Sequence, residues 1–259
     1  MKVKTQNPVN VICLKYGMRY PAHYVNRLYA GVRRHLHQPF QFFCCTEDPA
    51  GLHQDVRVIP FPANPGLSCG WPHVLVKLML TQKGFGDFEG PTLFLDLDVV
   101  ITGPLDDFFA FQPGRFCIIH NWVNWRKNLL GKRPHVGNSS VFRFDAGEPS
   151  DYIYQTFLRE KHRAEDRSQF NTEQAFMTYA AKEVTWWPDS WVKSYKWNCR
   201  PPFPLNLMKT PRLPEGCRVL VFHGKPDPDE AIAGYRGKRP HHHFKPAPWI
   251  ETHWSDAGA

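Results

Sequence analysis

The chain has 259 residues, of which 42% are hydrophobic and 22% are charged, and its formal net charge is +8. This composition is ordinary for a globular protein, and the length allows one large α/β domain, or one domain with an appendage, to bury a full core. No uninterrupted apolar stretch approaches the length that spans a bilayer, so a membrane-spanning chain is excluded.

The start of the chain and the cysteines both indicate the cytoplasm. The first eight residues contain no apolar signal region, and the seven cysteines include no Cys-x-x-Cys pair. Cys13, Cys44, Cys45 and Cys117 lie in apolar runs. We therefore expect reduced core thiols rather than a disulfide or zinc framework.

The positive charge is concentrated towards the C-terminus. Residues 191–259 hold 11 Lys and Arg against 6 Asp and Glu, without a basic run of five or more. This excess suits a positive rim around an anionic substrate. It also suits weak peripheral attraction to an anionic membrane surface.

Strands and helices are predicted to alternate up to about residue 100. Residues 9–14 predict a strand, and the apolar positions from Tyr24 to Leu36 predict an amphipathic helix. Residues 40–45 and 56–60 predict two further strands, and residues 74–79 a helix. An apolar run from Thr92 to the Gly103-Pro104 breaker then predicts one buried strand, which indicates a mainly parallel sheet wound with helices.

The second half of the chain is less regular. Strands are predicted at 115–119, 140–144 and 219–222, and helices at 151–160 and 172–182, the last with Thr172 as its N-cap. Residues 231–259 show no clear period. We expect a catalytic domain over 1–230 and a C-terminal lid or tail over 231–259, in which the three histidines at 241–243 form an exposed loop or part of the lid.

Asp96 and Asp98 carry the clearest chemical signal. Side chains two apart on an extended segment point the same way, while Leu97 between them faces the core. Acidic residues are disfavoured inside strands, so this placement indicates a strand tip that enters a site. Two such carboxylates suit Mg²⁺ or Mn²⁺ together with a substrate diphosphate.

Three further groups are expected to meet the acid pair, because ligands collect at the carboxyl ends of parallel strands. His223 ends an apolar run and precedes Gly224 and Lys225; an imidazole can complete a Mn²⁺ site, and a lysine can face a phosphate. The small polar residues around Asn138 can hydrogen-bond sugar hydroxyls. Glu173 and Gln174 open a predicted helix.

In this order, the elements and motifs resemble the metal-dependent glycosyltransferases of the GT-A fold, in particular the branch of glycogenin and the bacterial lipopolysaccharide galactosyltransferases. The resemblance spans about residues 9–230, and its specific parts are the aspartate pair at 96 and 98 and the His-Gly-Lys-Pro at 223–226. It implies a Rossmann-like nucleotide-diphospho-sugar transferase fold. The implied activity is Mn²⁺- or Mg²⁺-dependent transfer of a sugar to an acceptor hydroxyl, with a UDP-sugar as the expected donor. The expected setting is the synthesis of a cell-surface glycan or polysaccharide.

The resemblance also assigns roles to residues. Asp96 and Asp98 match the Asp-x-Asp motif and His223 the third metal ligand, while Lys225 matches the lysine that touches the donor diphosphate. Asn138, Glu173 and Gln174 match positions that contact the transferred sugar. Lys77 matches a basic position near phosphates and sugar, and Lys15 and Tyr16 match the strand end that cradles the nucleotide. The acceptor is a glycan, a lipid-linked molecule or a protein.

Two other functions compete with this one. Asp-Leu-Asp-Val after an apolar run also resembles the first motif of haloacid-dehalogenase-type phosphatases, whose leading aspartate is a nucleophile. That motif normally follows the first strand, whereas here it follows three. A basic nucleic-acid-binding module would require a basic, aromatic face, and it leaves Asp96, Asp98 and His223 without a role.

Overall fold

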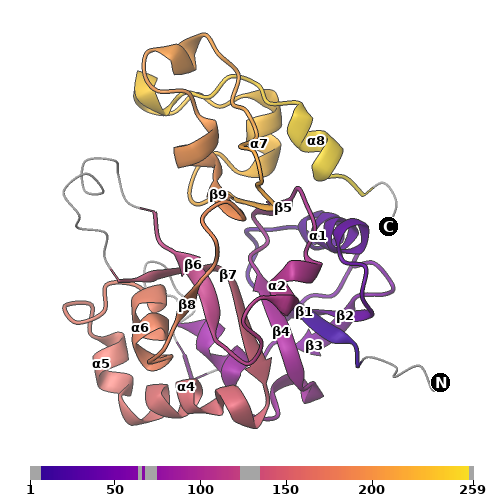
Figure 1. The fold of residues 1–259 in the computed structure, drawn as a ribbon, viewed down its shortest axis with the longest axis vertical. Helices are drawn as coiled ribbons and strands as arrows, with labels where there is room; N and C mark the ends of the chain where they lie inside the picture. The colour runs from indigo at the N-terminus through magenta and orange to yellow at the C-terminus, as the bar shows by residue number, and fades with distance from the viewer. Residues whose placement is uncertain (1–6, 64–65, 68–74, 123–134, 257–259) are drawn as a thin grey trace.

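The computed structural model describes residues 7–63, 66–67, 75–122 and 135–256, and its main element is a seven-stranded sheet of order β3-β2-β1-β4-β7-β6-β8 (Figure 1). β1 to β4 pair in parallel. β7 runs antiparallel to both of its neighbours, β4 and β6, and β8 pairs in parallel with β6. The bounds are β1 (Val9–Lys15), β2 (Phe40–Thr46), β3 (Arg57–Pro60), β4 (Gly90–Leu95), β6 (Cys117–His120), β7 (Gly137–Ala146) and β8 (Thr185–Trp186).

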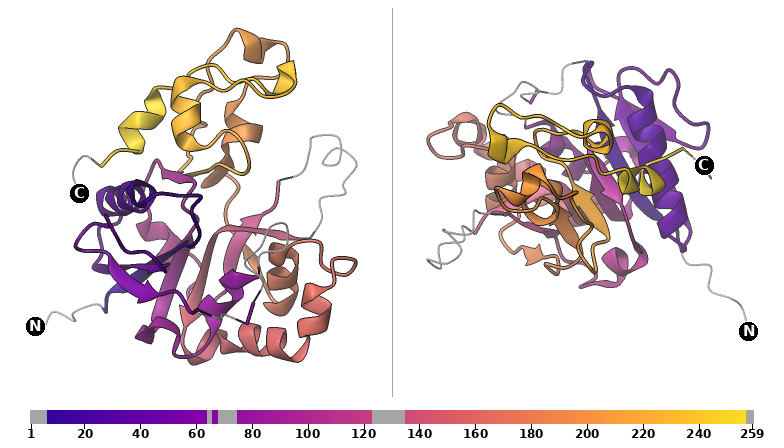
Figure 2. Two further views of the ribbon diagram at one scale, coloured as in Figure 1. Left: turned by 180° about the vertical axis from the view of Figure 1, so that it is seen from behind. Right: turned by 90° about the horizontal axis from the view of Figure 1, so that it is seen from above.

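Alternate side chains of β1 enter two separate cores, because successive residues of a strand face opposite sides of the sheet. Val11 and Cys13 pack in one core, and Ile12 and Leu14 in the other. Helices from both halves of the chain cover the two faces (Figures 1 and 2). The first core includes α1 (Ala22–His35) and α2 (Asp106–Ala110); the second includes η1 (Val76–Thr81), α4 (Glu148–Arg159) and α6 (Glu173–Ala180).

The segment around the acid pair differs from the prediction of one strand. β4 ends at Leu95, and a separate strand, β5 (Val99–Ile101), begins after Asp98. β5 belongs to a second, three-stranded sheet of order β5-β10-β9. It pairs antiparallel with β10 (Val219–Val221), which pairs in parallel with β9 (Val192–Ser194). The two carboxylates therefore lie at the junction between two sheets.

Residues 192–256, together called the C-terminal lobe, include β9 and β10 of this second sheet and pack onto α1 (Figure 1). The lobe contains η3 (Tyr195–Cys199), η4 (Leu205–Leu207), α7 (Pro228–Ala233), η5 (Pro240–His242) and α8 (Trp249–His253). Trp254 is 2% exposed and its ring lies 4.9 Å from that of Tyr24. The boundary predicted at residue 230 falls inside α7, and a lid role for residues 231–259 stays a prediction.

Most predicted strands and the longer helices are present, with shifts of a few residues at their ends. The helix predicted over 74–79 is the 3-10 helix η1 where it is described. Several short elements were not predicted: η2 (Phe85–Asp87), α5 (Lys161–Glu165), β8, β9 and the helices of the C-terminal lobe. The six cysteines in the described ranges are free and buried, as expected. None of the described helices is long and apolar enough to cross a membrane.

Candidate functional site

Asp96 and Asp98 are fixed by backbone pairing on both sides. The amide of Asp96 donates to the carbonyl of Ser140 on β7 at 2.9 Å, and the carbonyl of Asp98 accepts from the amide of Phe222 at 3.0 Å. The first bond belongs to the large sheet and the second continues the β5–β10 pairing. Because both sheets hold this short segment, the two carboxylates have a rigid base.

Two cavities meet at these carboxylates. The smaller, of about 300 Å³, is lined by Leu14, Tyr16, Arg19 and Tyr20 from the end of β1 and the turn after it. The larger, of about 590 Å³, is lined from β7, α6, η3 and the end of β10. Four residues line both cavities: Lys77, Asp96, Asp98 and Glu173. The acid pair thus separates two spaces into which two parts of one ligand, or two ligands, can enter.

Lys77 holds Asp96. Its Nζ lies 2.8 Å and 2.9 Å from the two carboxylate oxygens of Asp96, and 3.1 Å from the carbonyl oxygen of Ser139. Burial lowers the pKa of Lys77, but the negative charges of Asp96 and Glu173 outweigh it and leave this pKa raised. The ammonium group is therefore charged, and it balances one carboxylate of the site.

Asp98 carries a second, less compensated charge. Burial, and then the neighbouring charge of Asp96, raise its pKa to about 7. The hydroxyl of Tyr20 donates to Asp98 Oδ2 at 3.0 Å and opposes this shift in part. Asp96 and Asp98 repel each other when both are ionised. A bound cation would relieve this repulsion, so the pair favours an added positive charge.

Glu173 opens α6 beneath the larger cavity. The structure confirms Thr172 as the N-cap, since its side chain accepts from the amide of Ala175 at 3.4 Å. Glu173 Oε2 accepts from the hydroxyl of Ser139 at 2.8 Å, whereas its Oε1 is buried without a hydrogen-bond partner in the described part of the chain. Burial raises the pKa of Glu173 to about 7. A buried oxygen in this state is suited to a hydrogen bond from a ligand hydroxyl.

His223 follows β10 into the larger cavity. Its Nε2 lies 2.6 Å from the hydroxyl oxygen of Ser194, and its ring stacks on Trp122 with centroids 5.4 Å apart. Burial, together with the charge of Lys196, lowers the pKa of His223 to about 4. The imidazole is thus neutral near pH 7, which is the form that binds metals.

The donor set of this region fits a divalent cation. Two carboxylates and a neutral imidazole are the oxygen and nitrogen donors that Mn²⁺ accepts. Nε2 of His223 is directed to the hydroxyl of Ser194. The described residues contain no group of three His, Cys, Asp or Glu arranged to hold a metal ion. The carboxylate pair is the fixed part of the candidate site.

The structure brings most of the other predicted site residues to the same place. Asn138 and Gln174 line the larger cavity, and Tyr16 lines the smaller one, where its ring stacks on Phe61 at 5.4 Å. Lys15 and Lys225 line neither cavity.

Both of these lysines are engaged elsewhere. Lys15 Nζ donates to the carbonyl of Asp48 at 2.9 Å, which ties the end of β1 to the loop after β2. Lys225 Nζ lies 2.9 Å from an oxygen of Asp227 and 2.8 Å from one of Glu230.

Several residues of the site were not predicted. Arg19 and Tyr20 line the smaller cavity, and Lys196 and Trp197 line the larger. Arg19 and Tyr20 lie in the turn between β1 and α1, which faces the same sheet edge as the acid pair. That position was the available signal, since ligands collect at this edge of a parallel sheet.

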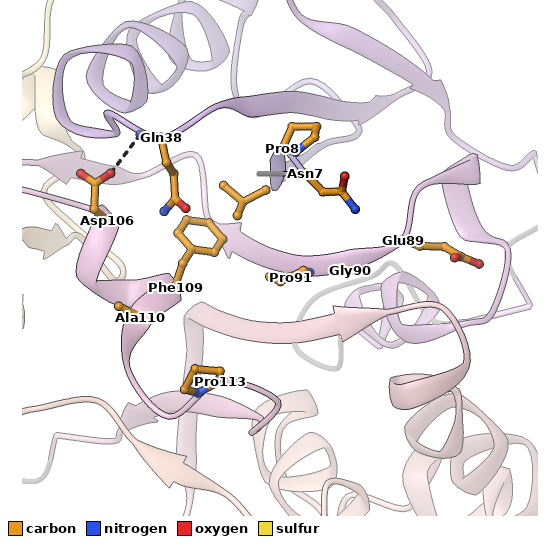
Figure 3. A pocket seen from close by; sticks show the side chains of 11 residues that line it. Asn7, Pro8, Gln38, Glu89, Gly90, Pro91, Asp106, Phe109, Ala110 and Pro113 are labelled. Carbon is orange, nitrogen blue, oxygen red and sulfur yellow. Dashed lines mark hydrogen bonds between the residues drawn. The ribbon is translucent and has the colours of Figure 1, made fainter. Parts of the chain in front are cut away.

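A further cavity, of about 760 Å³, lies at the opposite edge of the sheet (Figure 3). It is lined by Pro8, Gly90 and Pro91 at the starts of β1 and β4, with Phe109 and Pro113 beside them. Its Asp106 is already bonded to the backbone amide of Gln38 at 3.1 Å. Because it is at the amino ends of the strands and has no paired carboxylates, it is not the candidate catalytic site.

Comparison with known proteins bears on the fold. No protein-family model and no curated protein matches the chain. Among solved structures, the galactosyltransferase LgtC in complex with donor and acceptor sugar analogs is similar over 85% of this chain and 89% of LgtC, at 12% identity and a TM-score of 0.56. The bifunctional glycosyltransferase WbbM is similar over 88% of this chain and 48% of WbbM, at 12% identity and a TM-score of 0.56.

The glycosyltransferase GlyE of Streptococcus pneumoniae TIGR4 is also similar, with 12% identity, 85% of this chain and 56% of GlyE covered, and a TM-score of 0.57. At these identities the likeness concerns the fold. The architecture predicted from the sequence, the GT-A fold of glycosyltransferases, is therefore confirmed.

Proposed function

We propose that this chain is a glycosyltransferase that moves a sugar from a nucleoside diphosphate sugar, with UDP as the expected nucleotide, to an acceptor hydroxyl. One observation carries the proposal: on a glycosyltransferase fold, a rigid acid pair lies where two cavities meet. A nucleoside diphosphate sugar has two parts, a nucleoside and a sugar, that could occupy the two cavities, and its diphosphate joins them. The diphosphate would then lie at the carboxylates.

Asp96 and Asp98 would hold Mn²⁺ or Mg²⁺, with His223 as a further ligand once its ring leaves Ser194. When bound, such an ion neutralises charge on the diphosphate, which makes the nucleotide a better leaving group. Lys77 already balances the charge of Asp96 from the protein side. Lys225 would reach the diphosphate by exchanging Asp227 and Glu230 for the ligand.

The two cavities would divide the donor between them. In the smaller cavity, Tyr16, supported by Phe61, offers a ring for the base to stack on, and Lys15 secures the neighbouring strand ends. In the larger cavity, Asn138, Gln174 and the unpartnered oxygen of Glu173 would bind hydroxyls of the transferred sugar. We assign these three residues to positioning the sugar.

The biological setting belongs to the same proposal. Buried free thiols suit a cytoplasmic enzyme, and the expected products are cell-surface glycans or polysaccharides. Residues 231–259, with the histidines at 241–243, would act as a lid or tail beside the donor. The acceptor is a glycan, a lipid-linked molecule or a protein.

A screen of donor hydrolysis tests the activity. The purified chain is incubated with Mn²⁺ and UDP-, GDP- or CMP-sugars, and release of the free nucleotide is measured. We expect slow hydrolysis of a UDP-sugar that stops when a chelator removes the cation. Failure to hydrolyse any donor under conditions in which the chain is folded and binds Mn²⁺ would contradict the proposal.

A further inference from the structure

Arg19 lines the candidate site without a role in the donor contacts proposed above. It lies in the turn between β1 and α1, and it shares the wall of the smaller cavity with Asp96 and Asp98. Its guanidinium carbon lies 4.7 Å from the ring centroid of Tyr20, whose hydroxyl donates to Asp98. A ring of this kind supports a planar guanidinium by its face and leaves the N–H edge free to donate. Arg19 is therefore held beside the acid pair by a residue of the site itself.

Most of the hydrogen-bonding capacity of Arg19 is unused. A guanidinium has five N–H donors. In the described part of the chain, Arg19 makes one hydrogen bond, from Nη2 to Asp227 Oδ1 at 3.3 Å. The side chain is 60% exposed, so a ligand that enters the smaller cavity can reach the remaining donors. Burial lowers the pKa of Arg19, but interactions with Tyr20, Asp227 and Asp98 outweigh it and leave this pKa raised.

Asp227 brings a second cation beside Arg19. Its Oδ1 lies 3.3 Å from Nη2 of Arg19, and its Oδ2 lies 2.9 Å from Nζ of Lys225. The same carboxylate accepts from the backbone of Glu230 as the N-cap of α7. One carboxylate thus serves two cations and a helix cap. It holds the turn after β1 and the loop after β10 together, with their positive groups next to each other.

We propose that Arg19 binds the diphosphate of the donor through the N–H groups that Asp227 does not occupy. The paired oxygens of a phosphate match the fork of a guanidinium. The assignment rests on the proposed function, which puts the diphosphate at Asp96 and Asp98. These two carboxylates take up much of the charge of a divalent cation. A further positive group is therefore needed to balance a diphosphate that gains negative charge as the sugar leaves.

Arg19 acts in opposite directions on the two partners that the site is proposed to bind. Its positive charge repels a divalent cation at Asp98, and it attracts the diphosphate. Removal of this charge should therefore weaken the binding of UDP without weakening the binding of Mn²⁺ alone. A residue that only maintained the shape of the turn would change both affinities in the same direction. The pair of measurements thus separates a ligand contact from a structural role.

Calorimetric titrations of the full chain test the assignment without any need for activity. The chain is titrated with Mn²⁺ alone, and then with UDP at saturating Mn²⁺. We expect Arg19→Ala to bind UDP about tenfold more weakly, as for the loss of a charge-assisted hydrogen bond. The same variant should bind Mn²⁺ alone at least as tightly as the unchanged chain. Arg19→Lys keeps the charge but lacks the fork, and it should recover part of the UDP affinity.

The matched controls are Met18→Ala, at the fully exposed neighbour of Arg19 in the same turn, and Arg167→Ala, which removes one positive charge at an exposed position. Both should bind UDP like the unchanged chain. Unchanged UDP affinity in Arg19→Ala, equal loss in the controls, or a parallel loss of Mn²⁺ and UDP affinity would overturn the role of Arg19 and leave the proposed function in place. Absence of UDP binding by the folded, unchanged chain would instead overturn the proposed function, and this assignment with it.

Discussion

Electrostatic compensation at Asp98 is incomplete, whereas Asp96 is bonded through both oxygens to Lys77. In the described part of the chain, the side chain of Asp98 accepts a hydrogen bond from the hydroxyl of Tyr20, and burial with the charge of Asp96 raises its pKa to about 7. Near neutral pH, a bound cation would therefore stabilise the ionised form of Asp98. The folded structure itself does not depend on the negative charge of this carboxylate. Function and stability should separate at this residue.

Asp98→Asn should abolish cation-dependent UDP binding and donor hydrolysis without lowering the free energy of unfolding. The amide removes a metal ligand, relieves the repulsion with Asp96 and can still accept a hydrogen bond from Tyr20. Activity assays and thermal unfolding without added metal measure the two effects. Asp107→Asn, on α2, is the control and should keep full activity. Near-normal turnover by Asp98→Asn would refute its role.

Glu173 predicts a dependence of stability on pH. Its pKa rises from 4.5 to about 7 on folding, so the folded state binds more protons than the unfolded state between these values. Stability should therefore fall as pH rises through this window, by roughly 3 kcal/mol for this group when fully ionised. Asp98 contributes a change of the same sign.

Glu173→Gln should flatten this dependence, because a neutral side chain does not titrate. Denaturant unfolding without metal, from about pH 5 to about pH 8, measures the change. Glu165→Gln, at an exposed position on α5, is the control and should keep the dependence of the unchanged chain. A variant at Glu173 with the same slope as the unchanged chain would show that this carboxyl is not buried as described.

The sequence predicted which residues gather at the site better than it predicted their contacts. The spacing of Asp96 and Asp98, and the position of His223 after a strand, follow from local pattern, and these residues do line one cavity. The partners of Lys15 and Lys225 depend on which acidic groups the tertiary fold brings within reach of long, flexible side chains. Periodicity and spacing carry no information on that.

At the scale of elements, length decided what could be predicted. β1, β2 and α1 are long enough for a period of two or 3.6 residues to be recognised. β8 and β9 have two and three residues and show no period. The division of the predicted acidic strand into β4 and β5 also has no local signal, since both halves are equally apolar and only their pairing partners differ.

The stretch predicted as an aperiodic tail contains one of the largest buried side chains in the described part of the chain. Trp254, just after α8, packs against Tyr24, and the guanidinium of Arg27 lies 4.4 Å from its ring centroid. Trp254→Ala should lower the free energy of unfolding by about 3–5 kcal/mol, as for other large core aromatics. Denaturant unfolding checks this, with the exposed Glu251→Ala as control. A loss no larger than that of the control would mean that α8 is not part of the core.

At the scale of the whole molecule, two sheets meet at one acidic segment, and the C-terminal lobe completes the larger cavity with Lys196, Trp197 and His223. This arrangement brings the acid pair, His223 and part of the basic C-terminal segment together around one cavity. The nucleic-acid alternative leaves the acid pair without a role, and the similar solved structures bear on the fold, which differs from the order of elements that the phosphatase motif requires.

Calorimetric titration of the chain with UDP is the most direct test of the central claim, that the carboxylates of Asp96 and Asp98 bind a nucleotide diphosphate through a divalent cation. We predict saturable binding in the presence of Mn²⁺, and its loss both with a chelator and in Asp98→Asn. Tight UDP binding that persists without the cation, or in the variant, would contradict the account.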